Sequence, residues 1–577
     1  MLLLLAQLVA PPLQDGPIRL PGPPSQLERP SPAQPQPAPP VDVRPLETPA
    51  PQPDGGGAPP AGAGPAAPEP APQLPTSLAP APLPEIRGLT LYTPEQVRTI
   101  LAECSRIIDP QERLKACAVA LSTRLVFDGY VSSRVYVGSD PAPGYLDVVE
   151  GRVVGIQVSG SDPWLNRRVG RLLRPLRGQI LRLSTVELQL QLLKRQPGIE
   201  SVRGTLARLG SDPSEGVFRV AVEPSREPWQ GDLSLRNDGN SGSGEFRAVA
   251  TLLKPSLLRR GDTLLVYGEL DATDTPELGA AIASLSYTYP FSDNLSLTGG
   301  IGFSRRNLVE LPAPADGFST NQYQALAQFE WVFRESLSQR WSLFAGYSNS
   351  RSNIYEQGSA LPVSVPASVR APAGGYLRLG VNGSGAGRHS SWSGSAYLLQ
   401  GVAAATPTVQ RQELAEAGIV AGRATAIGGF LSASWTVSPR WQVNLRTAAQ
   451  LAFAPLTSSM QFTLGSDVGL RGLPGQLISG DSGWLASTEA VWTFWDSKTS
   501  ALQLVPFIGA GGIRTNFSGG SFGDTVGSGG LLLRWLASNH WSVELGWAVP
   551  FSTTDNLGPW NDWLLGQGLY TRVNYRF

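Results

Sequence analysis

Alternation of polar and apolar residues over about residues 230–577 is the feature that most restricts the fold of this 577-residue chain. The stretch 323–334 places Tyr, Ala, Phe and Trp on one face and Gln, Glu and Arg on the other, and the stretch 541–551 also turns its aromatic and aliphatic residues to one face. Successive strand residues point to opposite faces. A soluble barrel would expose such aromatic stripes, whereas an outer-membrane barrel turns them to lipid around a polar lumen.

About sixteen alternating segments can be counted, and an even number of strands of roughly ten residues is expected for such a barrel. Their centres lie near 234, 247, 266, 284, 298, 327, 344, 377, 394, 430, 445, 489, 507, 531, 546 and 572. The last segment alternates up to Tyr575 and Phe577, a C-terminal aromatic signal that favours closure in a membrane. The fold class predicted is therefore mainly β, a transmembrane antiparallel barrel over 229–577. A soluble β-sandwich or propeller is the alternative.

The composition agrees with an outer-membrane barrel and argues against several classes of function. Charged residues make up 16%, below the roughly 25% of ordinary soluble proteins, and the net charge of zero argues against a nucleic-acid partner. No apolar run approaches the ~20 residues of a transmembrane helix. His389 and His540 are isolated, and no phosphate loop or nucleophile context is present. We expect no enzyme, no cofactor and no metal site.

The N-terminal part predicts export. Met1–Ala10 resembles the apolar part of a secretory signal, with an apolar tail as the alternative. Residues 11–82 are rich in Pro, Ala and Gly, which favours a disordered tether, or else a spacer or lumen plug. Cys104 and Cys117 can form a disulfide in an exported protein, and two buried thiols are the alternative.

A repeated β-α-α-β-β order is predicted between these parts. The first unit, 83–151, has a strand over 85–92, capping boxes at Thr93 and Asp109, a helix running to about Phe127, and strands 132–137 and 144–149. The second unit, 152–225, has a strand over 152–158, a helix over 164–173, a capping box at Ser184, and strands 199–208 and 216–222. This repeat is an internal duplication, so the predicted fold includes two copies of one small α+β unit.

Two such units ahead of a barrel resemble the two POTRA domains and barrel of two-partner secretion outer-membrane transporters (the TpsB family, of the haemolysin activation/secretion type). The matching patches lie at 127–134, 149–152, 192–198 and 236–244. Gly469-Leu470-Arg471-Gly472-Leu473 resembles the Arg-Gly tip of the family's sixth extracellular loop, here at about 455–483. The resemblance implies that this loop folds into the lumen as a gate, where its Arg meets an Asp on strand thirteen.

The chain departs from the family at that Asp. The strand-thirteen motif is present as Phe507-Ile-Gly509-Ala-Gly511, with Gly509 in place of the carboxylate. A buried guanidinium needs a carboxylate partner. Asp467, Asp481, Glu489 and Glu544 are candidates, and we favour Glu489 because it lies on the adjacent strand twelve. Solvation of Arg471 by lumen water is the alternative.

The resemblance implies a bacterial outer-membrane transporter with periplasmic POTRA domains. The expected partners are an adhesin or haemolysin-like secreted exoprotein as cargo, outer-membrane lipid, and the barrel assembly machinery during biogenesis. Strand addition at POTRA edges, with Val217–Val222 and the strands near Val135 and Val148 as candidates, would capture the unfolded cargo. The alternative function is a barrel insertase of the same superfamily. A passive porin leaves the POTRA units unexplained.

Overall fold

The computed structural model describes residues 83–140, 144–194, 199–209, 212–224, 229–259, 261–310, 317–387, 389–517, 520–538, 540–552 and 559–577. The signal and tether predicted over 1–82 lie outside the described residues. None of the helices in the described ranges has the length and hydropathy needed to cross a membrane. The chain divides into two compact units, one that contains two α+β domains and one that contains a β-barrel.

The first α+β domain packs helices on a three-stranded sheet. Its elements are β1 (Glu85–Arg87), α2 (Pro94–Ile100), η1 (Cys104–Arg106), α3 (Pro110–Phe127), β2 (Arg134–Gly138) and β3 (Tyr145–Val149). The sheet order is β1-β3-β2, with β1 parallel to β3. Thr93 and Gln96 form the complete predicted capping box at α2, whereas at α3 only the Asp109 side chain caps the helix, by accepting from the Gln111 N–H.

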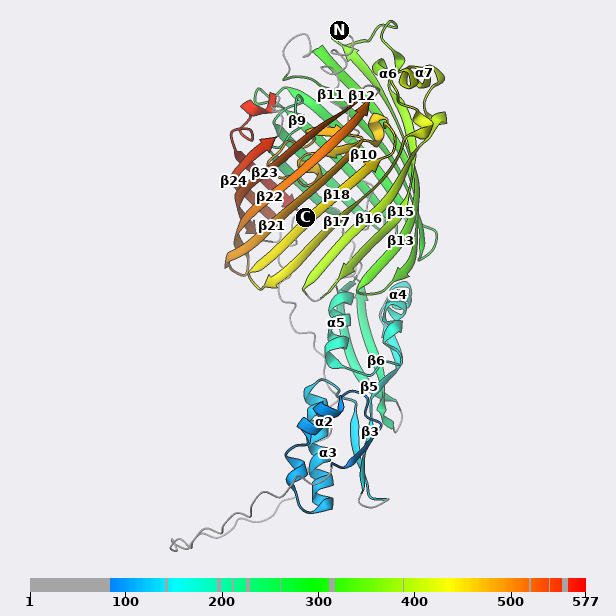
Figure 1. Cartoon of the computed structure of the whole chain (residues 1–577), viewed down its shortest axis with the longest axis vertical. Helices are drawn as coiled ribbons and strands as arrows, with labels where there is room; N and C mark the ends of the chain where they lie inside the picture. The colour runs from blue at the N-terminus through cyan, green and yellow to red at the C-terminus, as the bar shows by residue number, and fades with distance from the viewer. Residues whose placement is uncertain are drawn as a thin grey trace. The chain divides into compact units, whose positions relative to one another are not determined.

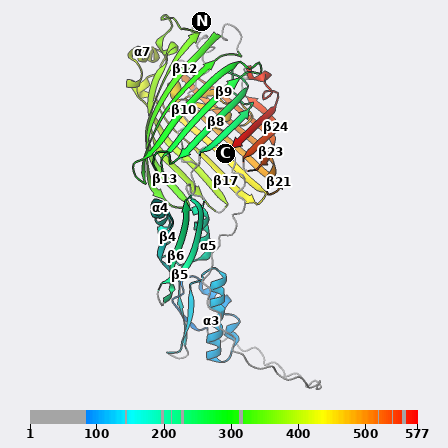
Figure 2. The ribbon, with the colours of Figure 1, turned by 180° about the vertical axis from the view of Figure 1, so that it is seen from behind.

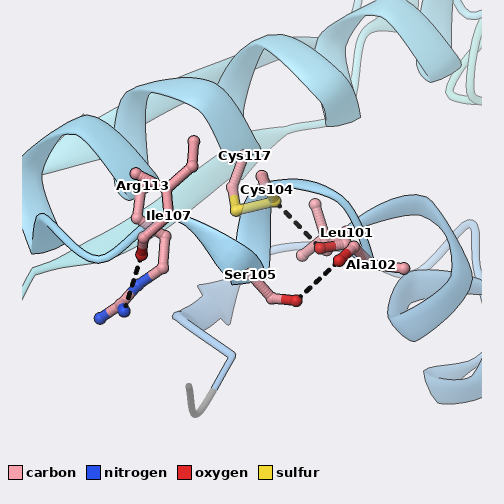
Figure 3. The surroundings of a disulfide bond; sticks show 7 residues. All are labelled: Leu101, Ala102, Cys104, Ser105, Ile107, Arg113 and Cys117. Carbon is pink, nitrogen blue, oxygen red and sulfur yellow. Dashed lines mark hydrogen bonds between the residues drawn. A yellow bond between two sulfur atoms is a disulfide. The ribbon is translucent and has the colours of Figure 1, made fainter. Parts of the chain in front are cut away.

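A disulfide joins the helical layer of this domain. Cys104 in η1 and Cys117 in α3 are bonded, with their Cα atoms 5.2 Å apart (Figure 3). Ser105 Oγ donates to the carbonyl of Ala102 at 2.8 Å, and Arg113 donates to that of Ile107 at 3.3 Å. The bond therefore holds the short turn before α3 against the middle of that helix.

The second α+β domain repeats the topology. It contains β4 (Arg152–Ser159), α4 (Pro163–Leu173), η2 (Arg174–Leu176), α5 (Leu183–Lys194), β5 (Ile199–Leu209) and β6 (Asp212–Pro224). The order is β4-β6-β5, and β4 is again parallel to the last strand. The prediction of a capping box at Ser184 is wrong, because α5 begins at Leu183 and Ser184 lies inside it.

Two of the predicted edges for cargo capture are also wrong. Val217–Val222 belongs to β6 and Val148 to β3, and both strands lie in the middle of their sheets. A central strand already pairs on both sides, so it cannot add a third strand. Val135 lies in β2, which is an edge, and the other edges are β1, β4 and β5.

The described residues from Gln230 onward form a closed antiparallel barrel with sixteen long strands, shown in Figure 1. The strands are β7 (Gln230–Arg236), β8 (Phe246–Pro255), β9 (Thr263–Ala272), β10 (Leu278–Pro290), β11 (Leu295–Asn307), β12 (Phe318–Glu335), β13 (Gln339–Glu356), β15 (Ala373–Ala386), β16 (Ser390–Gly401), β17 (Thr425–Ser438), β18 (Trp441–Ala452), β21 (Ser482–Asp496), β22 (Ser500–Phe517), β23 (Gly520–Ala537), β24 (Trp541–Ser552) and β25 (Leu569–Arg576). β14 (Ser359–Ala360) is a two-residue strand that turns back after β13 and pairs with its end in antiparallel fashion. Each predicted strand centre lies inside one of these strands, and the predicted fold class is confirmed.

The barrel wall has an apolar outer face and a polar inner face. On β12, Phe329 and Trp331 are about half exposed, whereas Gln322 and Gln328 are buried. On β24, Trp547 is exposed and Glu544 is buried. Figure 2 shows β8, β9 and β10 side by side on the opposite wall. The outer face has the inverted pattern of a barrel in lipid.

The barrel closes where β25 pairs with β7. This seam has five register pairs, fewer than any other pair of neighbouring long strands. Asn237 extends it, because its side chain donates to the carbonyl of Leu569 at 2.7 Å and accepts from the N–H of Thr571 at 2.8 Å. Phe577 exchanges two backbone hydrogen bonds with Gly231, at 2.9 and 3.0 Å. The terminal aromatic residue therefore lies at the closing seam.

Two α-helices interrupt the described part of the barrel region, in which the sequence predicts only strands. α6 (Ala367–Arg370) and α7 (Thr408–Glu416) lie in the connections after β13 and β16. The Glu413 carboxylate in α7 accepts from the N–H groups of Ala367 and Ser368 at 3.0 and 2.6 Å and so caps α6. α6 is a single turn and α7 is short and mostly exposed, and both lack the apolar period that would identify them in the sequence.

Candidate functional site: loop six in the barrel lumen

Loop six connects strands eleven and twelve of the barrel, β18 and β21, and covers residues 453–481. Its two sides pair as a small hairpin of β19 (Phe462–Leu464) and β20 (Ile478–Gly480). The turn η7 (Ser466–Val468) leads into the tip. There Gly469 and Gly472 have φ values of +116° and +82°. Only glycine adopts such angles without strain, so these residues allow Arg471 to be presented between two sharp bends.

The apolar side chains of the loop pack against the inner wall. Leu470 and Leu473 are fully buried, in one cluster with Phe507 of β22. A Cβ on Gly509 would lie 3.0 Å from a methyl of Leu470, and one on Gly511 would lie 2.7 Å from a methyl of Leu464. The glycines of strand thirteen therefore make room for the leucines of loop six. An aspartate at 509 would occupy the space that Leu470 fills.

Arg471 binds two carboxylates on different strands. Its Nε donates to Glu489 Oε1 on β21 at 2.8 Å, and its Nη1 donates to Glu544 Oε2 on β24 at 2.6 Å. Nη1 also lies 3.3 Å from the hydroxyl of Tyr570 on β25. Ser528 Oγ donates to the carbonyl of Arg471. The structure thus brings together Arg471 and Glu489, the pair favoured from sequence, and also Glu544, which was among the other candidates.

Glu544 is also held by the wall itself. Its second oxygen accepts from Arg534 Nε at 2.7 Å, and Arg534 is its register partner on β23. Arg572 on β25 is its partner on the other side. Without loop six, two glutamates and two arginines remain at this place. The wall is therefore close to charge balance when Arg471 leaves, so separation need not create an isolated buried charge.

Asp467, another candidate partner of Arg471, binds elsewhere. It accepts from Arg247 Nη1 on β8 at 2.6 Å. Asp481 accepts from the N–H groups of Leu456 and Asn516 at 3.1 and 2.8 Å, and so fixes the base of the loop. The sequence alone contained no signal for the Asp467 contact, because it depends on barrel closure.

A cluster of loop residues joins the connections after β7, β11 and β24. Glu310 accepts from the Trp563 indole N–H at 2.8 Å and from the Gly242 N–H at 3.1 Å. Glu245 accepts from the Leu564 N–H at 2.8 Å. Burial raises the pKa of Glu310 to about 7, although its two donors oppose the shift. We therefore expect this contact to respond to pH near neutrality.

The C-terminal residues Tyr575 and Phe577 stack with their ring centroids 6.0 Å apart, and Tyr575 lies 4.7 Å from Trp541. They belong to the outer face and the seam and lie apart from the loop contacts. Among the described residues, no group of three or more His, Cys, Asp or Glu side chains is arranged to hold a metal ion. The arrangement in the lumen suits a removable obstruction, since ion pairs, hydrogen bonds and leucine packing, and no covalent bond, hold the described tip of loop six against the wall.

A polar lumen, a closed sixteen-strand wall and an inward-folded sixth loop define an outer-membrane transporter of the two-partner secretion class. The chain belongs to the family described as "Haemolysin secretion/activation protein ShlB/FhaC/HecB", whose model matches residues 216–529. This membership confirms the resemblance found in the sequence.

Relatives agree with this assignment. The chain is 24% identical over 451 residues to "Outer membrane transporter CdiB" of Dickeya dadantii (strain 3937), covering 73% of this chain and 74% of the relative. Among solved structures, CdiB from Escherichia coli superposes with a TM-score of 0.56 at 17% identity, covering 85% of this chain and 89% of that one. CdiB from Acinetobacter baumannii gives 0.50 at 15% identity, covering 87% and 91%. At these identities the two structures support the fold alone.

Proposed function

We propose that this protein exports a secreted exoprotein, which it captures unfolded in the periplasm and passes through the barrel lumen without nucleotide. Loop six is the gate. The observation that carries this proposal is Arg471, whose guanidinium donates to two wall carboxylates at 2.8 and 2.6 Å while the wall keeps its own arginines. A loop held in this way can leave the lumen and return. A wall whose carboxylates were neutralised only by Arg471 would be destabilised when the loop moved.

Capture uses the free edges of the POTRA sheets. β2 is the best candidate among them, because it is an edge strand and carries Tyr136 and Val137, which are 46% and 44% exposed. An extended segment of cargo can add to this edge through main-chain hydrogen bonds and place alternate side chains on the exposed aromatic and aliphatic groups. This binding mode tolerates many sequences, which suits an unfolded substrate.

The lumen then provides a polar path. An unfolded chain exposes backbone N–H and C=O groups that cannot enter lipid without partners. The inner wall presents buried polar side chains such as Gln322, Gln328 and Gln503. Folding of the cargo outside the cell would bias its net movement outward and replace nucleotide hydrolysis as the driving force.

Deletion of the gene tests the proposal. The culture medium and the outer-membrane fraction are compared by mass spectrometry between the deletion strain, the strain complemented with the wild type, and a strain complemented with Arg471→Ala. Loss of one large secreted protein, restored by the wild type and reduced with Arg471→Ala, is expected. A broad loss of outer-membrane proteins with normal secretion would contradict export and support a barrel insertase instead. Arg411→Ala on the exposed face of α7 is the matched control.

A further inference from the structure

Loop six has a second ion pair with the wall, four residues before Arg471. Arg247 on β8 approaches Asp467 with both arms of its guanidinium, Nη1 to Oδ1 at 2.6 Å and Nη2 to Oδ2 at 3.3 Å. The side chains are 1% and 9% exposed. A two-armed contact between guanidinium and carboxylate fixes orientation as well as distance. The loop is therefore positioned here as firmly as at its tip.

The wall around Arg247 does not depend on Asp467. Arg247 Nη2 also donates to Glu269 Oε2 on β9 at 2.6 Å, and its Nε lies 3.9 Å from Asp271 Oδ1. Asn240 donates to Asp271 at 2.5 Å. If Asp467 leaves, Arg247 keeps both wall carboxylates. The tip of loop six is arranged in the same way, because Glu544 keeps its hydrogen bond from Arg534 if Arg471 leaves.

Neighbouring contacts support the same end of the loop. Gly475 donates its N–H to the carbonyl of Gly239 at 2.9 Å, and Arg306 on β11 donates to the Gln476 side chain at 2.9 Å. A small cavity of about 40 Å³ adjoins Arg247, Asp467 and Gln476. A water needs at least about 10–15 Å³ of such volume, so water can approach the ion pair and hydrate its groups as they separate.

The two ion pairs lie on opposite sides of the barrel seam. Arg471 contacts β21, β24 and β25, at the end of the strand order, and Asp467 contacts β8, at its beginning. Between them β25 pairs with β7 through the shortest register of the barrel. We propose that Asp467 and Arg247 form a second clamp, which positions loop six across the seam and thereby holds Arg471 in place. Asp467 is a positioning residue in this scheme.

A single thiol in the loop can report on the clamp. The chain has two cysteines, and both are in the disulfide, so an introduced cysteine is the only free thiol. Ser466 is suited to it, because its Oγ is buried and makes no hydrogen bond, so Ser466→Cys removes no hydrogen bond. The purified full-length protein is labelled with a maleimide in detergent. Each rate is divided by that of the same variant unfolded in urea, which removes the effect of residue 467 on intrinsic thiol reactivity.

Asp467→Asn is expected to raise the normalised labelling rate at least tenfold, which corresponds to about 1.4 kcal/mol and lies near the lower end for a hydrogen bond to a charged group. Asp467→Glu keeps the charge and should restore most of the protection. Glu416→Gln, on the exposed surface of α7, should leave the rate unchanged. Heat-modified migration on gels selects folded barrels for comparison. Equal labelling rates for Asp467→Asn and the parent would overturn the second clamp.

The clamp's role in secretion rests on the proposed function, and a separate measurement decides it. Labelling needs no cargo, so its result stands whatever the protein transports. If labelling rises and secretion by Asp467→Asn also changes, the clamp and the gate are both supported. If labelling rises while secretion stays at the wild-type level, the clamp stands and the gating role of loop six is contradicted.

Discussion

Replacement of Arg471 by alanine is expected to open the barrel without preventing its assembly. The change removes donors to Glu489 and Glu544, at 2.8 and 2.6 Å, and to Tyr570 at 3.3 Å. Hydrogen bonds to charged groups contribute about 1.5–3 kcal/mol each, and neighbouring contacts are not additive. Because Arg534 still neutralises Glu544, we expect a net loss of about 3 kcal/mol, toward the lower end for a broken buried pair.

A change of about 3 kcal/mol corresponds to roughly a hundredfold shift between loop-in and loop-out states. The assay is single-channel recording in planar lipid bilayers, with the fraction of time at high conductance as the measured quantity. Arg471→Lys should lie between alanine and wild type, since an ammonium group cannot reproduce the fork that binds two carboxylates.

The control for this experiment is Arg411→Ala, which removes an arginine from the exposed surface of α7. It should behave as the wild type in conductance and in assembly. If Arg471→Ala has the open fraction and the secretion rate of the wild type, the ion pairs at the tip do not hold the gate and the reasoning fails.

Three further predictions concern single contacts. Glu489→Gln should raise conductance only, whereas Glu544→Gln should also lower the yield of folded barrel on heat-modified gels, because it leaves Arg534 without its carboxylate. Because burial raises the pKa of Glu310 to about 7 from an ordinary value near 4.5, its contribution to loop packing is fully present below pH 4.5 and is lost as the pH rises through 7. The amide-exchange rate at Gly242, divided by its intrinsic rate at each pH, should therefore rise across that range, and Glu310→Gln should remove this rise. Replacing Cys104 and Cys117 by serine opens a loop with a sequence separation of 13 and should cost about 3 kcal/mol, measured by proteolysis of the full-length protein in urea. Unchanged digestion would argue against a stabilising role for the bond.

The sequence was sufficient for the wall of the barrel, since alternation is a local property of each strand. It also placed Glu489 on strand twelve, beside the missing carboxylate at Gly509. The sequence offered Glu544 only as one of four candidate partners of Arg471, because Glu544 lies on a strand three places further along the barrel. The Arg247–Asp467 pair joins residues separated by 220 positions, and only closure of the barrel brings them together.

The errors in the sequence predictions have the same cause, because contacts between distant segments leave no local pattern in the sequence. Which strand lies in the middle of each α+β sheet depends on a parallel pairing between distant strands, β1 with β3 and β4 with β6. Alternation carries no information on that order, so Val217–Val222 could not be recognised as central. The helix α7 is short and mostly exposed, and it lacks the apolar spacing that identifies longer helices.

The most direct test of the account is to lock loop six to the wall and measure secretion. Leu470 and Gly509 are neighbours where the loop meets the wall, since a Cβ on Gly509 would lie 3.0 Å from a methyl of Leu470. Mass analysis of the double cysteine variant first establishes that the two thiols pair. The double variant Leu470→Cys with Gly509→Cys is compared with each single variant, under oxidising conditions and after mild reduction. We expect the oxidised double variant to assemble, to lose secretion, and to regain it on reduction. Secretion at the wild-type rate through a barrel with its loop locked in place would contradict the claim that loop six is the gate.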